Sequence, residues 1–230
     1  MDRMGFVVAA LVAAAWLNGC GSDGKALTWD FEDGTAMGFY ADQSDFSEVT
    51  RGGLDAAVEA LPSPLAGKGF RVTADNHSDD QWAFIARELG AAEGVVAGQR
   101  YEAKIAIHLA SKEASGCMGA GGSAEAVTVK GGVVTTKPVA LPADANGYIG
   151  FSAKKGEQTN FDVESVDLGN IAAGGECGQE NPWKILERSG TMEVTAGADG
   201  KLWVYVGTDS GFEAQHTISY DEVSVTLTAK

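Results

Sequence analysis

The sequence predicts an all-β protein in which two antiparallel sheets pack face to face as a β-sandwich. Apolar and polar residues alternate with a period of two in about a dozen short segments, the pattern of a strand with one buried face. Glycine is frequent, with 31 residues, and proline is scarce, with 5, which suits short strands and tight turns better than long helices. Turn sequences such as Ala145-Asn146-Gly147 separate the segments.

The alternating segments give the expected strands in chain order. In the clearest one, Tyr101, Ile105 and Leu109 share one face, and Glu102 and His108 lie on the other. The stretch 87–97 contains two glycines and no good capping residue, so it is predicted to be a strand end and a loop rather than a helix. The expected strands cover residues 27–31, 70–74, 82–88, 101–109, 126–130, 148–152, 161–168, 183–188, 192–196, 202–208 and 215–229.

Length and composition predict one domain over residues 26–230. No proline-rich linker, repeat or change in composition divides this stretch, and 44% of the 230 residues are hydrophobic, which allows a substantial core. The formal net charge is −15. Binding to nucleic acid depends on lysine and arginine that neutralise phosphates, so this charge argues against a nucleic-acid partner. It also disfavours binding to an anionic membrane through a basic face.

The first 19 residues are predicted to be a lipoprotein signal peptide. Their apolar run, 6–17, is too short to span a bilayer as an ordinary helix. It closes with Leu17-Asn18-Gly19-Cys20, which resembles a bacterial lipobox and implies a lipid anchor on Cys20. Residues 20–25 are then the lipidated cysteine and a short tether. The alternative is a conventional secretory signal with an incidental cysteine.

The residue after Cys20 bears on the location of the protein. It is Gly21 rather than aspartate, and by resemblance to the sorting rules of Gram-negative bacteria this implies the outer membrane. The expected location is the cell envelope, outside the cytoplasm, with the membrane as a partner through Cys20. Cys117 and Cys177 then remain as an even pair in an oxidising compartment, which predicts a disulfide between them. The alternative is two buried free thiols.

The two ends of the domain carry a resemblance to a known family. Trp29-Asp30-Phe31-Glu32-Asp33-Gly34 and the segment 218–225 resemble the first and last strands of carbohydrate-binding modules with a galactose-binding-like jelly-roll fold. The resemblance implies a jelly-roll-like sandwich whose first and last strands are neighbours. It also implies a structural calcium ion, with Glu32 and Asp221 as candidate ligands. The alternative is that both acids are solvated or cap turns.

A second resemblance links the chain to a group of exported bacterial lipoproteins and implies no function. It rests on short polar and glycine-rich segments at 76–80, 119–122, 169–172 and 207–213.

Two polar loops are the candidate ligand-binding segments. The first, 75–80, offers Asn76, His77, Asp79 and Asp80 between two strands. The second is the turn after the strand 202–208, with Asp209 and Glu213. If the two loops converge at one end of the sandwich, they form a rim for a ligand. The alternative is that the Asn and Asp side chains of the first loop bond to their own backbone in Asx turns, and that Glu213 is solvated.

Aromatic side chains give a further indication of the ligand. Sugar-binding sandwiches stack Trp or Tyr against the apolar face of a pyranose ring while polar side chains bond to its hydroxyls. Tyr148 and three tryptophans are available, but most aromatics in strands are core residues. Tyr40 and Trp183 lie in or beside predicted loops and are therefore the candidate stacking residues.

These observations predict a lipid-anchored, extracytoplasmic binding module without catalytic residues, with a carbohydrate as the candidate ligand. The first alternative is a structural or protein-partner lipoprotein of the envelope, which would show an exposed apolar patch. The second is a hydrolase or lyase on the same sandwich. It would require the acids and His77 to cluster in a cleft with perturbed pKa values.

Overall fold

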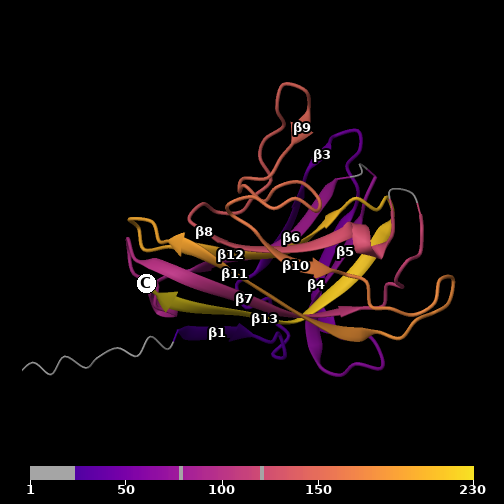
Figure 1. Cartoon of the computed structure of the whole chain (residues 1–230), viewed down its shortest axis with the longest axis horizontal. Helices are drawn as coiled ribbons and strands as arrows, with labels where there is room; N and C mark the ends of the chain where they lie inside the picture. The colour runs from indigo at the N-terminus through magenta and orange to yellow at the C-terminus, as the bar shows by residue number, and fades with distance from the viewer. Residues whose placement is uncertain (1–23, 78–79, 120–121) are drawn as a thin grey trace, which may run out of the picture.

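The computed structural model describes residues 24–77, 80–119 and 122–230. In these ranges the chain is all-β, with two main antiparallel sheets that pack face to face (Figure 1). The predicted fold class is confirmed. Two short 3-10 turns, Ala91–Glu93 and Ala124–Ala126, interrupt the loops. Within the described ranges no helix is long and apolar enough to cross a membrane.

The first sheet is built around β13, the longest strand. β13 pairs with β7 along one edge and with β5 and β1 along the other. Trp29 lies opposite Val223, so the first and last strands of the domain are neighbours, as the resemblance implies. In sheet order the strands are β11 (Lys184–Thr195), β7 (Arg100–Ser111), β13 (Gln215–Ala229), β5 (Lys68–Asp75) and β4 (Leu54–Ala60), with β1 (Lys25–Trp29) on β13.

The second sheet has β12 at its centre, between β8 and β6. A separate pair, β3 (Phe46–Ser47) with β9 (Tyr148–Ile149), lies beyond its edge strand β2. In sheet order the strands of the second sheet are β10 (Val166–Asn170), β8 (Val127–Val134), β12 (Leu202–Ser210), β6 (Gln81–Leu89) and β2 (Tyr40–Ser44).

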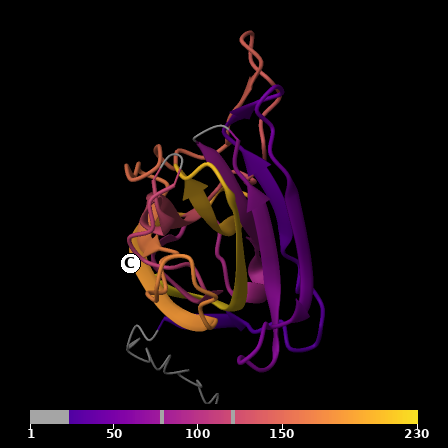
Figure 2. The same cartoon turned by 90° about the vertical axis from the view of Figure 1, so that its right-hand side faces the viewer.

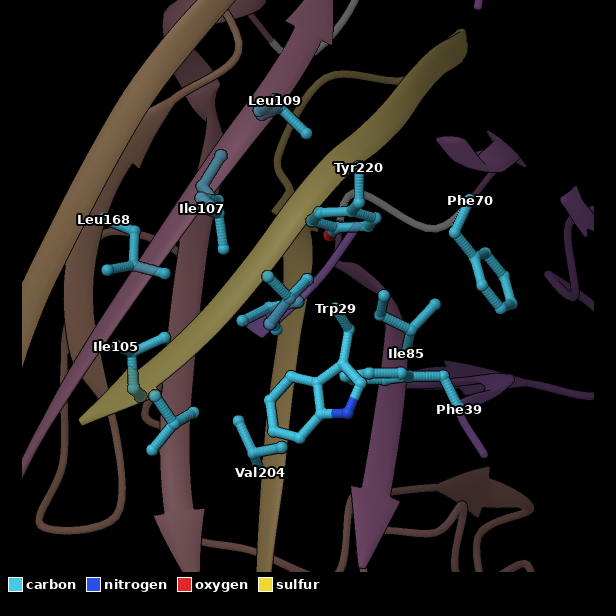
Figure 3. Packing of buried hydrophobic residues seen from close by; sticks show 14 of the residues in the cluster. Trp29, Phe39, Phe70, Ile85, Ile105, Ile107, Leu109, Leu168, Val204 and Tyr220 are labelled. Atoms are coloured by element: carbon cyan, nitrogen blue, oxygen red, sulfur yellow. The ribbon is translucent and has the colours of Figure 1, made fainter. Parts of the chain in front are cut away.

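The main core fills the space between the two sheets. Figure 3 shows Trp29, Phe39, Ile85 and Val204 pointing toward one another there. The indole of Trp29 meets the ring of Phe39 edge-on, at 5.5 Å between centroids. Burying each such side chain stabilises the fold by roughly 1.5–3 kcal/mol. The alternation along each strand places its apolar residues on one face, which is why the sequence pattern predicts them as core residues.

Several strands differ from the sequence prediction. The predicted segments 183–188 and 192–196 join as one strand, β11, and the predicted strand 126–130 continues to Val134. The predicted strand 161–168 begins only at Val166, and 148–152 shrinks to the two residues of β9. β2 and β4 were not predicted, because their sequences YADQS and LDAAVEA carry acids and alanines that are uncommon in strands.

The long connection between β8 and β10, residues 135–165, covers one face of the second sheet. It includes β9 and folds over the face of this sheet that points away from the main core, and it is called the covering segment below. Figure 1 shows it above β8, β12 and β6, with β9 at its upper end beside β3. Because of this segment, both faces are buried along β8, most of β12 and the first part of β6.

Candidate functional site

An aromatic cluster occupies the outer face of the second sheet, under the covering segment. Trp82 and Phe84 project from β6 and Tyr205 from β12, and all three are fully buried. Phe151 of the covering segment inserts among them, with ring centroids 4.8 Å from Phe84 and 5.3 Å from Tyr205. The hydroxyl of Tyr205 donates to the carbonyl of Glu164 at 2.6 Å. These contacts attach the covering segment to the sheet.

Next to the aromatic cluster lies a buried ion network of Asp45, Lys130, Lys155 and Asp209. The Lys155 ammonium is 2.7 Å from a carboxylate oxygen of Asp45 and 2.8 Å from one of Asp209. Lys130 reaches the same Asp209 oxygen at 2.8 Å. Burial on its own lowers the pKa of Lys155, but Asp209 and Asp45 outweigh it and hold that pKa above its usual value. The network therefore binds β8 and β12 of the sheet to the covering segment through ion pairs.

Local backbone geometry places two members of this network. Asp45 separates β2 from β3 and has a φ of 65°, a left-handed conformation that aspartate tolerates better than most residues. Gly156 follows Lys155 with a φ of +74°, and a Cβ there would lie 2.3 Å from the carbonyl oxygen of Asn160. Glycine at position 156 is thus required for the tight turn that directs Lys155 inward.

Asp80 extends the acidic side of the network. Burial raises its pKa to about 9, and a side-chain hydrogen bond with Glu157 and the charge of Asp209 add to this, while Lys155 opposes it. Asp80 therefore keeps its proton at neutral pH. The loop before β6 and the covering segment are joined by this pair of carboxyl groups.

A cleft of about 370 Å³ opens beside the network, next to the β3–β9 pair. Tyr148 forms part of its wall, and the residue is 38% exposed. Burial raises the pKa of Tyr148, and Asp45 adds to the effect, so its hydroxyl stays protonated. This Tyr148 cleft is lined by Asp45, Tyr148, Gly150, Phe151, Ala153, Lys154, Lys155, Gly156, Glu157 and Asp162.

The two polar loops predicted to form a ligand rim do lie together. The buried side chain of Asn76 donates to the carbonyls of Ser210 at 2.6 Å and Phe212 at 3.1 Å. Asp80 and Asp209 come together in the acidic part of the network. Asn76 therefore holds the two loops in contact, and its amide nitrogen points to backbone rather than into the Tyr148 cleft.

Three other predicted residues lie elsewhere in these loops or outside the description. His77 is exposed and lies 3.0 Å from Asp75, so it does not join the buried acids. Glu213 is exposed in the turn after β12. Asp79 lies outside the described residues. Among the described residues, His77 is therefore separate from the buried acids Asp80 and Asp209.

Tyr40 and Trp183, the predicted stacking residues, lie in two different places. The hydroxyl of Tyr40 donates to the carbonyl of Pro138, and its ring meets Trp203 edge-on at 6.2 Å. Burial raises the pKa of Tyr40 to about 12. Tyr40 thus fastens the covering segment, and it is not among the residues that line the Tyr148 cleft.

Trp183 lies in a separate groove of about 490 Å³, which shares no lining residue with the Tyr148 cleft. The Lys112 ammonium lies 5.7 Å from the centre of the indole ring. The Trp183 groove is lined by Pro62, Ser63, Pro64, Glu180, Asn181, Pro182 and Trp183.

Glu32 and Asp221, the predicted calcium ligands, come close enough to interact electrostatically. Burial raises the pKa of Asp221 and Glu32 adds to the effect, whereas His108, 3.9 Å away, lowers it. The backbone N–H of Lys68 donates to the Glu32 carboxylate, and the Lys68 ammonium donates to the Glu32 carbonyl. In the part of the chain that the structure describes, no group of three His, Cys, Asp or Glu side chains is arranged to hold a metal. The calcium site stays a prediction.

The predicted disulfide between Cys117 and Cys177 is confirmed, with 5.4 Å between the Cα atoms. It links the loop after β7 to the loop before β11, and its sequence separation of 60 residues corresponds to a stabilisation of about 4 kcal/mol in the loop-entropy model. Cys20, the predicted lipidation site, lies outside the described residues.

Sequence reasoning missed several residues of the site: Asp45, Lys130, Lys155 and the role of Tyr148. One signal was present. Lys130 stands in VTVKGGVV, a strand in which every residue is buried, and a buried ammonium requires a partner. The partners Asp45 and Lys155 are 110 positions apart, so no local pattern joins them.

No family model and no curated protein matches this chain. Among solved structures, it is similar to the CBM22-1 xylan-binding domain from Paenibacillus barcinonensis Xyn10C, with 17% identity, a TM-score of 0.42 and coverage of 92% of this chain and 99% of that one. It is also similar to TmCBM27, a carbohydrate-binding module that recognises mannan, with 10% identity, a TM-score of 0.42 and coverage of 89% and 96%.

A third similar structure is among carbohydrate-binding modules of the β-sandwich superfamily, with 13% identity and a TM-score of 0.41. The match covers 92% of this chain but only 63% of that one. These modules are the kind of domain that the two end segments of the sequence resemble. The sandwich assignment itself rests on the strand order of this chain.

Proposed function

We propose that this protein is a lipid-anchored, extracytoplasmic binding module without catalytic activity, and that the Tyr148 cleft binds a small carbohydrate. The observation that carries the proposal is the partly exposed ring of Tyr148 beside carboxylates that buried ammonium groups hold in place. A sugar presents an apolar face and a set of hydroxyls, and such a wall complements both.

Ion pairs hold the polar side of the cleft in place. Asp45 is only 4% exposed and is fixed by its ion pair with Lys155. Lys155 is fixed in turn by Asp209 on the central strand β12. A ligand would therefore meet an acceptor that needs little ordering on binding, and such preorganisation raises affinity.

The position of the cleft in the molecule suits an anchored binding module. Figures 1 and 2 show the β3–β9 pair at one end of the sandwich and β1 at the opposite end. β1 begins at Lys25, five positions after the predicted lipidation site Cys20. An anchor at Cys20 would therefore direct the cleft away from the membrane. The test of the anchor is Cys20→Ser, which should move the protein from the membrane fraction to the soluble fraction of the envelope.

The binding proposal is tested with the purified protein on a broad panel of glycans. Tyr148→Ala should weaken binding at least tenfold because it removes the stacking ring while leaving the buried network in place. Trp183→Ala is the matched control, since Trp183 lies in the separate groove, and it should leave affinity unchanged. Recovery of the bound glycan with unchanged mass supports a module without catalytic activity.

Two results would count against this proposal. Absence of binding across the panel removes the carbohydrate. Loss of binding in Trp183→Ala but not in Tyr148→Ala moves the site to the Trp183 groove.

A further inference from the structure

We infer that the Tyr148 cleft selects sugars by charge: it accepts neutral and amino sugars and rejects acidic ones. This inference rests on the proposed function and names the class of ligand that the cleft takes. It follows from the hydrogen-bonding capacity of the side chains that line the cleft, counted one by one.

Lys155 has no N–H left for a ligand. An ammonium group has three donors and no acceptor. Those of Lys155 have three acceptors within reach: Asp45 at 2.7 Å, Asp209 at 2.8 Å and the carbonyl of Gly156 at 3.0 Å. Although Lys155 lines the cleft, its ammonium cannot pair with an anionic ligand without leaving one of these partners.

Lys130 is occupied in the same way. Its ammonium contacts Asp209 at 2.8 Å and the carbonyls of Asn160 at 2.8 Å and Lys155 at 3.3 Å. Its side chain is fully buried. The two lysines therefore neutralise carboxylates of the protein rather than attract anions from solvent.

The remaining charged groups of the lining are mostly acidic. Asp45, Glu157 and Asp162 line the cleft, and Lys154 is its exposed cation. Carboxylates accept hydrogen bonds and cannot donate them when ionised. A wall of this kind favours a ligand that brings donors, such as hydroxyl or ammonium groups. A carboxylate on the ligand would instead face like charge in a partly desolvated site.

The test compares sugars that share stereochemistry and differ in one substituent. The purified full-length protein is titrated with glucose, glucosamine and glucuronate, and with the matching galactose and mannose series, by isothermal calorimetry at constant ionic strength. In any series that binds, we expect the acidic sugar to bind at least tenfold more weakly than the neutral one. The amino sugar should bind at least as tightly as the neutral one.

Two variants test whether the acidic lining of the cleft causes the discrimination between neutral and acidic sugars. Glu157→Gln removes a charge and keeps the size of the side chain. It should therefore reduce the difference in affinity between the neutral and the acidic sugar. Glu187→Gln makes the same change at an exposed acid of β11 that does not line the cleft, so it should leave the binding of both sugars unchanged. Thermal unfolding of both variants checks that the fold is retained.

The outcomes separate this inference from the proposed function. If neutral and acidic sugars bind equally well, the inference is overturned while the carbohydrate-binding function stands. If no sugar of any series binds, the proposed function fails and the inference fails with it.

Discussion

The central strands of the second sheet are buried on both faces, but by different means. Along β12, Val204 and Val206 point into the apolar core between the sheets. Tyr205 and Asp209 point to the other face, where aromatic rings and buried charges lie under the covering segment. The inner face is covered by a sheet, and the outer face by a segment with two strand residues of its own.

This difference shows what each face depends on. The inner face is held by area burial, which is non-directional and spread over many residues. The outer face depends on a few directional contacts, among them the ion pairs of Asp209 and the hydrogen bond from Tyr205 to Glu164. Removing a single polar group should therefore change the free energy of unfolding in opposite directions on the two faces.

The largest effect is expected from Asp209→Ala. This substitution leaves the ammonium groups of Lys130 and Lys155 without their shared carboxylate in a fully buried position. Breaking a buried ion pair by removing one partner costs about 3–5 kcal/mol. The free energy of unfolding, from urea denaturation at pH 7, should fall by about that amount.

The neighbouring Glu213→Ala is the matched control for this prediction. Glu213 is an exposed acid four positions from Asp209, and its removal should change the free energy of unfolding by less than about 0.5 kcal/mol. A loss below about 1 kcal/mol in Asp209→Ala would show that the outer face does not depend on its ion network.

The same contrast explains how much of the molecule the sequence reveals. The pairing of β1 with β13 follows from the resemblance of the two end segments, and the alternation along β7 indicates its buried face. Along β6, by contrast, the first six residues are all buried, because the covering segment closes the face that would otherwise be wet. Alternation of apolar and polar residues identifies a strand with one buried face. It cannot identify a strand that is buried on both faces.

The site shows the same limit. Asp80 and Asp209 were predicted because each lies in a polar segment next to a predicted strand. Lys155 and Tyr148 belong to the covering segment, and their positions depend on contacts with Asp45, β3 and β12, which are far away in the sequence. Local patterns cannot supply such contacts, so the loops could be predicted as candidates but the cleft could not.

The second prediction concerns a polar group on the inner face. His216 of β13 is buried between the sheets, and its Nε2 lies 3.0 Å from the hydroxyl of Thr208. Burial lowers the pKa of His216 to about 4, so the folded state keeps it neutral. The unfolded chain takes up a proton below its ordinary pKa of about 6.5. Stability is therefore full above pH 6.5 and falls as the pH drops toward 4, by roughly 3 kcal/mol.

The measurement is the free energy of unfolding between pH 4 and 7 for the protein and for His216→Gln. The glutamine does not titrate, so the difference between the two curves isolates the contribution of the histidine. That difference should shrink steadily as the pH falls. A constant difference across this range would mean that His216 has the same pKa in the folded and the unfolded state.

The smallest effect is expected from a pair of hydroxyl deletions, one on each face. Tyr205→Phe removes the hydrogen bond that joins the outer face to the carbonyl of Glu164, and a bond of this kind contributes about 0.5–1.5 kcal/mol. Tyr220 on the inner face is equally buried, and among the described residues its hydroxyl has no hydrogen-bond partner. Tyr220→Phe should therefore leave stability unchanged or raise it, because it removes an unsatisfied polar group.

Amide hydrogen exchange measures the effect of each hydroxyl deletion in the covering segment and in β13 separately. In Tyr205→Phe we expect faster exchange in residues 160–165, where the covering segment loses an attachment, and unchanged exchange in β13. In Tyr220→Phe exchange should be unchanged in both regions. If the two variants lose the same stability and exchange alike, the covering segment is held by area burial as the inner face is, and the distinction between the two faces disappears.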